Sequence, residues 1–354
     1  MSDRSLHGAP ARYAAGLQEL GEGVWAWLQP NGGLGESNAG LVRGKGESLL
    51  VDTLWDLRLT ARMLAQMGPP CEQAPIRRLV NTHADGDHCW GNQLLSGAEI
   101  IGTQACADEM AGEDPRAVRL LRRAASIAGP VLAHAPRSLP GVEQGAGLGA
   151  FAALLEPFDF EGIEVCPPTR TFEGTLELEV GARKVEVIEV GPAHTPGDAI
   201  VHVPDASVVF AADVMFVGVA PIMWSGSVER WQAALDRITE LHPRAVVPGH
   251  GPVCELDGVQ AMRDYWAFVA PAVRERVAAG STPEQAAHEV IASPDYERQP
   301  FAEWEGAERL IVSADTIARN DRGEIGRPGD VARIGLLSAM GRLAGERARA
   351  GGQS

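Results

Sequence analysis

Cysteine is scarce in this 354-residue chain, and the five that occur form no CxxC pair. An odd number of scattered cysteines suits neither a disulfide framework nor an iron–sulfur cluster. No apolar run is long enough to cross a bilayer, and the first twenty residues have no apolar segment of the kind that signal peptides carry. These absences predict a cytoplasmic protein without disulfides, membrane spans or iron–sulfur clusters.

Positive charge is also in short supply. Lys and Arg number 31 against 47 Asp and Glu, which gives a formal net charge of −16. Such a balance repels nucleic-acid backbones and anionic membranes, so we expect neither as a partner and expect a small-molecule substrate instead. The short basic stretches PIRRLV and RLLRR are compatible with ordinary solvated positions or with contacts to an anionic cofactor tail.

What the chain does have is 45% hydrophobic residues in patterns that predict an α/β layered fold. GVWAWLQP, SLLVDT and PIRRLVNTH are predicted strands, and DLRLTARMLAQM between the last two is a predicted helix. Two strand pairs are predicted in TLELEVGARKVEVIEV and AIVHVPDASVVFAADVMF, followed by a serine-capped helix and the short strand AVVPGHG. Strands alternating with helices at this rhythm favour sheets with helices packed on them.

The remaining segments divide into a loop and helices. We predict a helix over residues 104–127 and then a Gly- and Pro-rich loop near residues 128–147, which would cover a substrate pocket. From residue 256 onward the periodicity is helical throughout, and STPEQ has the features of a helix start. The predicted division is therefore an α/β domain over residues 1–255 and a helical C-terminal extension over 256–354 packed on it. The length of the extension is compatible with a homodimer.

Histidine and aspartate gather where the predicted strands end. The stretch NTHADGDHCWGN, residues 81–92, follows a buried strand, and three more such residues follow later strands. Loops at strand ends are where metal and catalytic groups usually converge. Imidazole and carboxylate together suit zinc, iron or manganese. The candidate ligands are His83, Asp85, Asp87, His88, His194, Asp213 and His250. Seven ligands exceed one tetrahedral site, so two metals sharing one aspartate are the economical interpretation.

The motifs THADGDH, GPAHTPGD, FAADVMF and VPGHG, with LLVDT upstream, resemble those of the metallo-β-lactamase superfamily over roughly residues 20–255. The resemblance implies an αββα sandwich with a dinuclear metal site at one edge. By position it implies His83, Asp85 and His194 on one metal, Asp87, His88 and His250 on the other, Asp213 as the bridge, and Asp52 as a support of the motif loop.

Asp85 departs from the family pattern, because HxDxDH stands here in place of HxHxDH. An acidic residue at this place is similar to the di-iron branches of the superfamily, which often carry HxExDH. A carboxylate makes the first site harder and more anionic, which favours iron or manganese over zinc. We therefore expect two metal ions, iron first and zinc next. Asp85 would ligate through one oxygen or through water, or would instead cap a helix or support the ligands.

Other conspicuous residues have no matching motif. Cys89 is expected to be a small buried hydrophobe, with ligand or nucleophile as the alternative. Trp90 and Asn92 are expected to pack the motif loop, and Trp224 to line a pocket or the core. Four further histidines, His134, His202, His242 and His288, are expected to be structural or at the surface.

No GxSxG elbow suggests a serine nucleophile, so the expected chemistry is attack on a carbonyl by a metal-bridging hydroxide. Asp87 would carry the proton as the catalytic residue. Among substrates an acyl-CoA type thioester is favoured, with an ester or lactone next. The alternative is a di-iron oxygen-activating oxidase or hydroxylase, although no flavodoxin-like electron donor follows. A third hypothesis is a non-catalytic binding protein on the same scaffold, which the intact ligand set disfavours.

Overall fold

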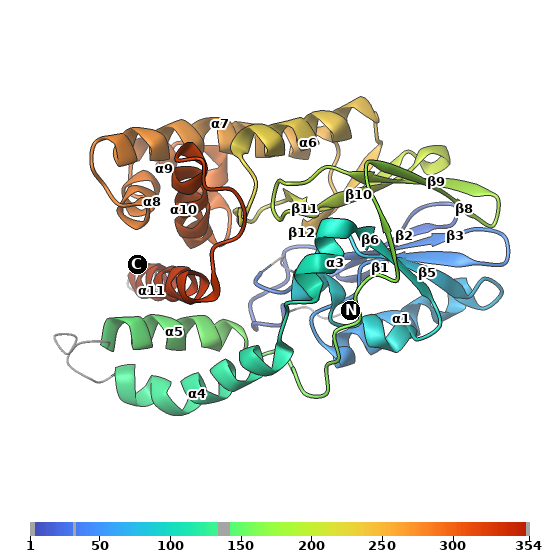
Figure 1. The fold of residues 1–354 in the computed structure, drawn as a ribbon, viewed down its shortest axis with the longest axis horizontal. Coiled ribbons are helices and arrows are strands. Elements are labelled where there is room, and N and C mark those ends of the chain that lie inside the picture. The colour runs from blue at the N-terminus through green and yellow to red at the C-terminus, as the bar shows by residue number, and fades with distance from the viewer. Residues whose placement is uncertain (1–3, 31–32, 134–141, 352–354) are drawn as a thin grey trace.

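Two β-sheets lie face to face in the computed structural model, which describes residues 4–30, 33–133 and 142–351 (Figure 1). Within these residues the first sheet has the order β1-β2-β3-β4-β5-β6-β7 and the second the order β12-β11-β10-β9-β8. The strands of the first sheet are β1 Gly16–Gly21, β2 Val24–Leu28, β3 Ala39–Arg43, β4 Ser48–Val51, β5 Ile76–Val80, β6 Glu99–Thr103 and β7 Arg170–Phe172. Those of the second are β8 Thr175–Val180, β9 Arg183–Glu189, β10 Ala199–Val203, β11 Val208–Phe216 and β12 Ala245–His250.

Helices lie against both sheets and also pack on one another. The α-helices of the described residues are α1 Leu57–Cys71, α2 Gly86–Cys89, α3 Gln104–Met110, α4 Pro115–Ala133, α5 Val142–Leu154, α6 Val228–Glu240, α7 Leu256–Ala278, α8 Pro283–Ile291, α9 Pro294–Glu297, α10 Leu310–Asp321 and α11 Asp330–Gly351. Helix α1 packs on the first sheet, while α6 and α7 pack on the second (Figure 1). The predicted αββα sandwich with a helical C-terminal region is confirmed.

The strands form where the sequence alternates or is continuously apolar. Side chains such as Val42, Leu49, Val187, Val201 and Phe210 fill the space between the sheets. β10 and β11 are buried along their whole length, as expected for central strands covered on both faces. Removal of this apolar surface from water is the main force that holds the two sheets together.

Capping residues set the predicted helix starts. The side chain of Ser227 accepts a hydrogen bond from the Arg230 N–H at the start of α6. Thr282 and Gln285 form a reciprocal capping box at the start of α8. Both starts lie where the sequence predicted them, because these caps are local signals.

The predicted loop near residues 128–147 is wrong for the residues that the structure describes. α4 continues to Ala133 and α5 begins at Val142, while His134 lies outside the described residues. Gly147 explains part of the error, because it lets α5 approach α11 closely: a Cβ there would lie 2.3 Å from the Ser338 carbonyl oxygen. Glycine in this helix therefore serves packing and not chain reversal. The helix predicted over 104–127 is also divided, into α3 and α4.

The C-terminal helices share a core with the second sheet. Trp231 of α6, Trp266 of α7 and Leu310 of α10 belong to one buried cluster together with side chains of β11. The predicted division at residue 255 stays a prediction, since this cluster extends across it. No helix in the described part of the chain is both long and apolar enough to cross a membrane.

Candidate metal centre

The seven predicted ligands come together at one edge of the sandwich, where four segments meet. His83 and Asp85 follow β5, and Asp87 and His88 lie on the short helix α2. His194 lies in the loop after β9, and His250 is the last residue of β12. Asp213 differs from the prediction, because it lies within β11 and not beyond its end. The pairing register of β11 with β12 shifts on either side of Ala212, whose φ is +44°, so a bulge directs Asp213 into the site.

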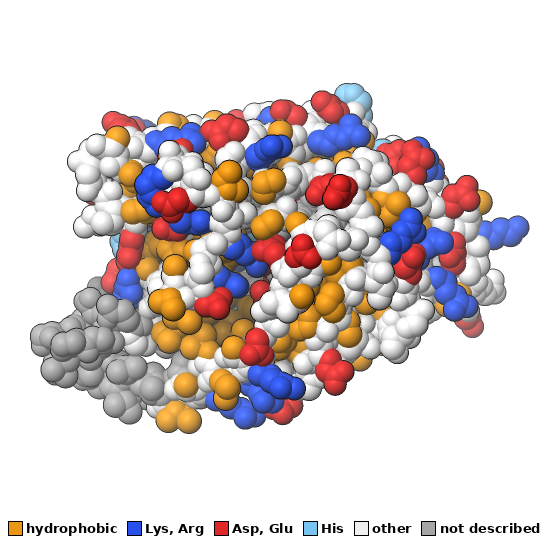
Figure 2. All heavy atoms as spheres, in the orientation of Figure 1, with side chains coloured by type: hydrophobic (Ala, Val, Ile, Leu, Met, Phe, Trp, Pro, Cys, Tyr) orange, Lys and Arg blue, Asp and Glu red, His pale blue; other side chains and the backbone are white. Residues whose placement is uncertain are grey.

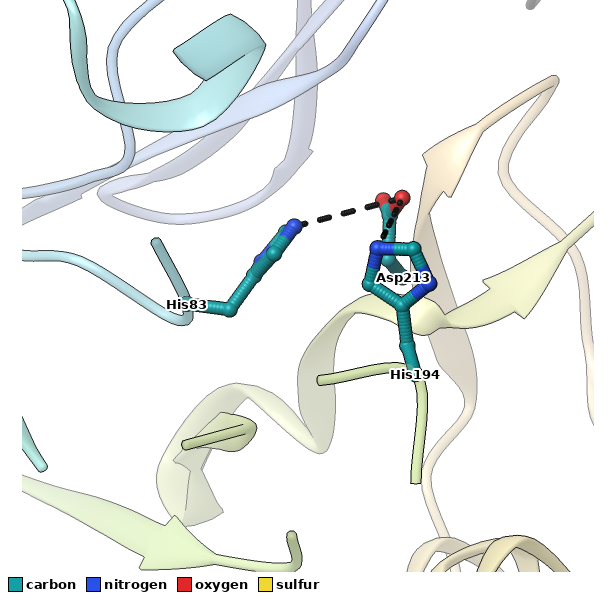
Figure 3. A group of neighbouring side chains, drawn as sticks. All are labelled: His83, His194 and Asp213. Atoms are coloured by element: carbon teal, nitrogen blue, oxygen red, sulfur yellow. Dashed lines mark ion pairs between the residues drawn. The ribbon is translucent and has the colours of Figure 1, made fainter. Parts of the chain in front are cut away.

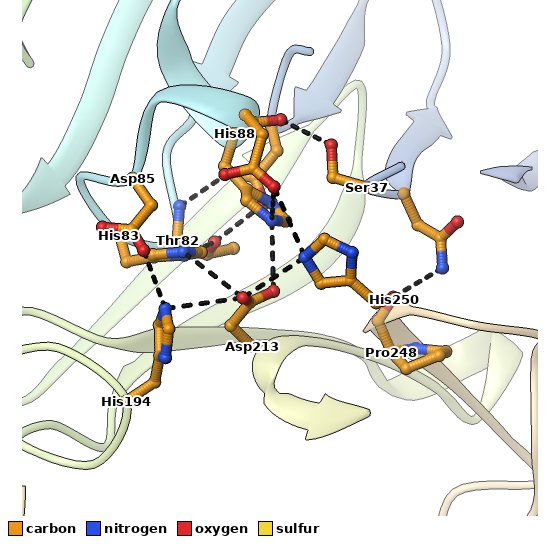
Figure 4. Close-up of polar contacts among 12 residues, drawn as sticks. Ser37, Thr82, His83, Asp85, His88, His194, Asp213, Pro248 and His250 are labelled. Atoms are coloured by element: carbon orange, nitrogen blue, oxygen red, sulfur yellow. Dashed lines mark hydrogen bonds and ion pairs between the residues drawn. The ribbon is translucent and has the colours of Figure 1, made fainter. Parts of the chain in front are cut away.

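Two groups of ligand atoms converge. Those of His83, His194 and Asp213 lie within 4.8 Å of one another (Figure 3), and so do those of Asp87, His88 and His250. Asp213 lies between the groups (Figure 4): its Oδ1 is 3.1 Å from His88 Nε2, and its Oδ2 is 3.4 Å from both His194 Nε2 and His250 Nε2. His83 Nε2 is 4.0 Å from the same Oδ2. Asp213 thus has the place expected of a bridge.

Partners on the outer side orient the imidazoles. His88 Nδ1 lies 3.1 Å from Asp52 Oδ2, and His194 Nδ1 lies 2.6 Å from the Ile222 carbonyl oxygen. His83 Nδ1 lies 3.0 Å from Thr82 Oγ1. Each contact occupies Nδ1 and leaves Nε2 directed at Asp213, which is the usual arrangement of metal-ligating histidines.

Several inward-facing atoms have no hydrogen bond within the described residues. They are His83 Nε2, His88 Nε2 and Asp213 Oδ1, all buried. His88 Nε2 and Asp213 Oδ1 are close in distance but do not meet in hydrogen-bonding geometry. Buried polar atoms without partners cost free energy unless a ligand satisfies them. The donor set of imidazole nitrogens and carboxylate oxygens therefore fits metal ions.

Charge is distributed unevenly over the site. Burial, with a contribution from His88, lowers the pKa of His83 to about 3. Burial also disfavours the cation at His194, but Asp85 and Asp213 outweigh it and raise its pKa to about 9. Burial opposes ionisation of Asp213, yet His250 and His88 hold its pKa well below the usual range. In the metal-free protein His83 is therefore neutral at pH 7, whereas His194 is protonated and lies beside the carboxylates of Asp85 and Asp213.

The pKa of His194 predicts how the stability of the metal-free protein changes with pH. A histidine whose pKa rises on folding from 6.5 to about 9 stabilises the fold fully below pH 6.5, and this contribution is lost as the pH rises through 9. The loss is of the order of 3 kcal/mol. Urea unfolding in the presence of a chelator should therefore show a lower free energy of unfolding at pH 9 than at pH 6.5. Equal values at the two pH values would contradict the charged His194.

Sequence reasoning missed three kinds of supporting residue. Asp198, in the quoted motif GPAHTPGD, accepts hydrogen bonds from the backbone N–H groups of Ala193 and Thr195 and so shapes the His194 loop. Its place three residues after Thr195 is a local signal that could have found it. Asn38 donates hydrogen bonds to the carbonyl oxygens of Pro248 and Gly251, on either side of His250. The third is Arg327, which pairs with Asp85 across 242 residues of chain.

Asp85 is at the helix-capping position of α2, but its side chain makes no capping hydrogen bond. Its Oδ2 lies 3.0 Å from His194 Nε2, and its Oδ1 pairs with the guanidinium of Arg327. Burial raises the pKa of Asp85, but Arg327 and His194 outweigh it and hold the pKa well below the ordinary value. The capping alternative is therefore wrong, and Asp85 contacts the first ligand group.

Side chains near the site that drew notice in the sequence are buried. Cys89 is fully buried with its Sγ 3.4 Å from the Ala84 carbonyl oxygen, and Trp90 is also in the core. Asn92 binds Thr53 and Asn81 through its side chain. Trp224 is 7% exposed and lies below the guanidinium groups of Arg327 and Arg333.

Fold and site together define a sandwich with a candidate metal centre at its edge. The family model described as the metallo-beta-lactamase superfamily matches residues 32–250, so the chain belongs to that superfamily. Members of the superfamily are metal-dependent hydrolases.

Solved structures support the same fold. A metallo-beta-lactamase from Pontibacter korlensis is 17% identical with a TM-score of 0.52, and the match covers 72% of this chain and all of that one. The sec-alkylsulfatase Pisa1 from a Pseudomonas species is 17% identical with a TM-score of 0.61, and the match covers 86% of this chain. This chain spans half the length of the alkylsulfatase.

Proposed function

We propose that the chain is a hydrolase that holds two metal ions through the seven side chains of the candidate centre and cleaves a thioester or a related ester. The observation that carries this proposal is that the Nε2 atoms of all four histidines face Asp213. In three of these rings the Nδ1 atom contacts Asp52, Thr82 or Ile222 on the outer side. His83, Asp85 and His194 would hold one ion and Asp87, His88 and His250 the other, with Asp213 shared. Iron is the first candidate and zinc the second, because three of the seven ligands are carboxylates.

Bound metal ions would supply a hydroxide at neutral pH and polarise the carbonyl oxygen of the substrate. The chain itself would supply proton transfer through Asp87, whose side chain is 15% exposed whereas that of Asp213 is 5% exposed. Burial disfavours ionisation of Asp87, but His88 and His250 outweigh it and lower its pKa, so the group is ionised at neutral pH, which is the form that takes up a proton. Hydrolysis of a thioester consumes one water and yields a carboxylic acid and a thiol.

The surface near the centre suits an apolar acyl group. Figure 2 shows a hollow on this face, between α3 and the α5 and α11 helices, with hydrophobic side chains along its floor and charged ones at its inner edge. Phe151, Leu155, Phe158, Trp224 and Met340 belong to one cluster that these helices share with the first sheet. Apolar walls with a few polar groups are typical of small-molecule sites.

Sulfate ester hydrolysis is a second candidate. The match to the alkylsulfatase covers 86% of the chain, which is more than residues 1–255 alone contain, so it includes part of the C-terminal helices. Arg327 pairs with Asp85 and lies with Arg333 over Trp224, so positive charge beside the first ligand group would favour an anionic sulfate ester. Both guanidinium groups are already paired with carboxylates, which places this candidate second.

A substrate panel under two atmospheres tests the proposal. Iron-loaded and zinc-loaded enzyme would be given acyl-CoA thioesters, aryl esters, lactones and alkyl sulfates, with and without oxygen. We expect thiol release from acyl-CoA thioesters at the same rate in both atmospheres. Sulfate release alone would favour the second candidate. Oxygen consumption with added reductant and no hydrolysis would contradict both and favour a di-iron oxidase.

A further inference from the structure

Arg327 brings a charge from the C-terminal region into the metal centre. It lies between α10 and α11, and its side chain is only 11% exposed. One terminal nitrogen pairs with Asp85 Oδ1, while Nε lies 3.1 Å from a carboxylate oxygen of Glu109. A third nitrogen lies 3.8 Å from Glu113. Three carboxylate neighbours and little exposure restrict the position of this guanidinium.

The two carboxylate oxygens of Asp85 make different contacts. Oδ1 is engaged by Arg327, and Oδ2 faces His194 Nε2 in the first ligand group. Only Oδ2 is therefore directed at the place where a metal ion would be held. The aspartate offers a single donor atom toward the centre, as an imidazole does.

The net charge of the Asp85–Arg327 pair also matches that of a histidine. An aspartate in place of a histidine adds one negative charge to the first group, and the adjacent guanidinium adds one positive charge. Because the two side chains are only 11% and 19% exposed, solvent screens this pair less than an ion pair at the surface. Together they have the net charge of a neutral imidazole.

We propose that Asp85 and Arg327 act as one unit that replaces a histidine in the first group, with Arg327 as a positioning residue that selects the donor oxygen and offsets its charge. The proposal rests on the metal centre proposed above. It makes the charge balance of that centre depend on the segment between α10 and α11. It also weakens the argument that the extra carboxylate favours iron over zinc, because Arg327 neutralises the charge of Asp85.

The proposal predicts the sign of a double-substitution effect. Asp85→His alone leaves the guanidinium of Arg327 beside an imidazole, so the affinity of the first site for zinc should fall by about tenfold or more. Adding Arg327→Gln restores the original net charge of the site. The double variant should therefore bind zinc at the first site about tenfold more tightly than Asp85→His does. If Arg327 only anchors its segment through Glu109 and Glu113, the second substitution should weaken binding further.

The measurement is zinc content by elemental analysis together with zinc affinity by competition with a chromophoric chelator. Arg333→Gln is the matched control, because Arg333 lies over the same tryptophan and pairs with Glu113 but has no contact with Asp85 in the described residues. Added to Asp85→His, the Arg333→Gln substitution should leave the zinc affinity as low as in Asp85→His alone. A folded double variant that binds zinc no better than Asp85→His would overturn the proposal.

A further variant, Asp85→Asn, tests the proposal even if the double variant does not fold. Asp85→Asn keeps the shape of residue 85 and leaves Arg327 its two glutamate partners, so the fold should persist. We expect it to lose zinc from the first site, and wild-type zinc affinity in this variant would overturn the proposal. If the wild-type chain itself holds no zinc or iron, the proposed metal centre fails, which is a different outcome.

Discussion

Asparagine in place of Asp213 is expected to lower kcat/KM by about a thousandfold or more, equivalent to ~4 kcal/mol of barrier. Among the residues that the structure describes, Asp213 is the carboxylate whose two oxygens approach both ligand groups, with Oδ1 near His88 and Oδ2 near His194 and His250. The amide keeps the shape of the side chain but removes its charge and one acceptor oxygen. The two halves of the centre would then lose their shared ligand.

The measurement combines steady-state kinetics with metal content. We expect the Asp213→Asn variant to hold fewer metal ions per chain than the wild type, alongside its loss of activity. Asp205→Asn is the matched control, since Asp205 lies between β10 and β11 at the other end of the same strand, is 54% exposed and pairs with Arg183. Its activity should be unchanged. A variant at position 213 with full metal content and near-normal kcat/KM would show that Asp213 is not the bridge.

Local patterns explain why so much of the fold could be predicted. Strands β2, β4, β5 and β8 to β12 appear as alternating or apolar runs, whereas β1 shows no such pattern; the capping residues Ser227 and Thr282 are signals within one helical turn. Six of the seven ligands could be recognised because they follow or end such a run, whereas Asp213 lies within β11. The superfamily motifs then supplied the order in which these residues meet, which periodicity alone could not give.

The errors came from contacts between distant segments. Gly147 is indistinguishable in sequence from a loop glycine until Ser338 and Gly341 of α11 lie against it. The bulge at Ala212 appears only where β11 pairs with β12. Arg327 lies in a polar stretch whose sequence gives no sign that it reaches Asp85. In each case tertiary packing, and not local propensity, decides the outcome.

The role of Asp52 leads to the second large expected effect. Its backbone adopts a φ of +61° at the end of β4, which directs the carboxylate toward the motif loop. Oδ1 accepts a hydrogen bond from the Thr82 N–H, and Oδ2 accepts one from the Thr82 hydroxyl and lies against His88 Nδ1. All of these atoms are buried, so no water can substitute readily. Asp52 therefore fixes both the loop and the protonated nitrogen of His88.

Asp52→Asn should lower metal affinity by about tenfold to a hundredfold, because outer partners of ligating histidines usually contribute that much. The amide has one acceptor oxygen for three donors, so its NH₂ group would face an N–H or force the His88 proton onto Nε2. That tautomer cannot ligate through Nε2. Chelator competition at pH 7 would measure the loss, with Asp205→Asn again as the control.

Asp52→Ala extends this test to stability. It would leave the Thr82 N–H without its acceptor, which costs about 1–3 kcal/mol for each buried group, and would place alanine at a positive φ. We therefore expect the free energy of unfolding of the metal-free protein to fall more in Asp52→Ala than in Asp52→Asn. Equal and small losses in both variants, together with unchanged metal affinity, would mean that the His88 ring is held by packing against its neighbours and not by this carboxylate.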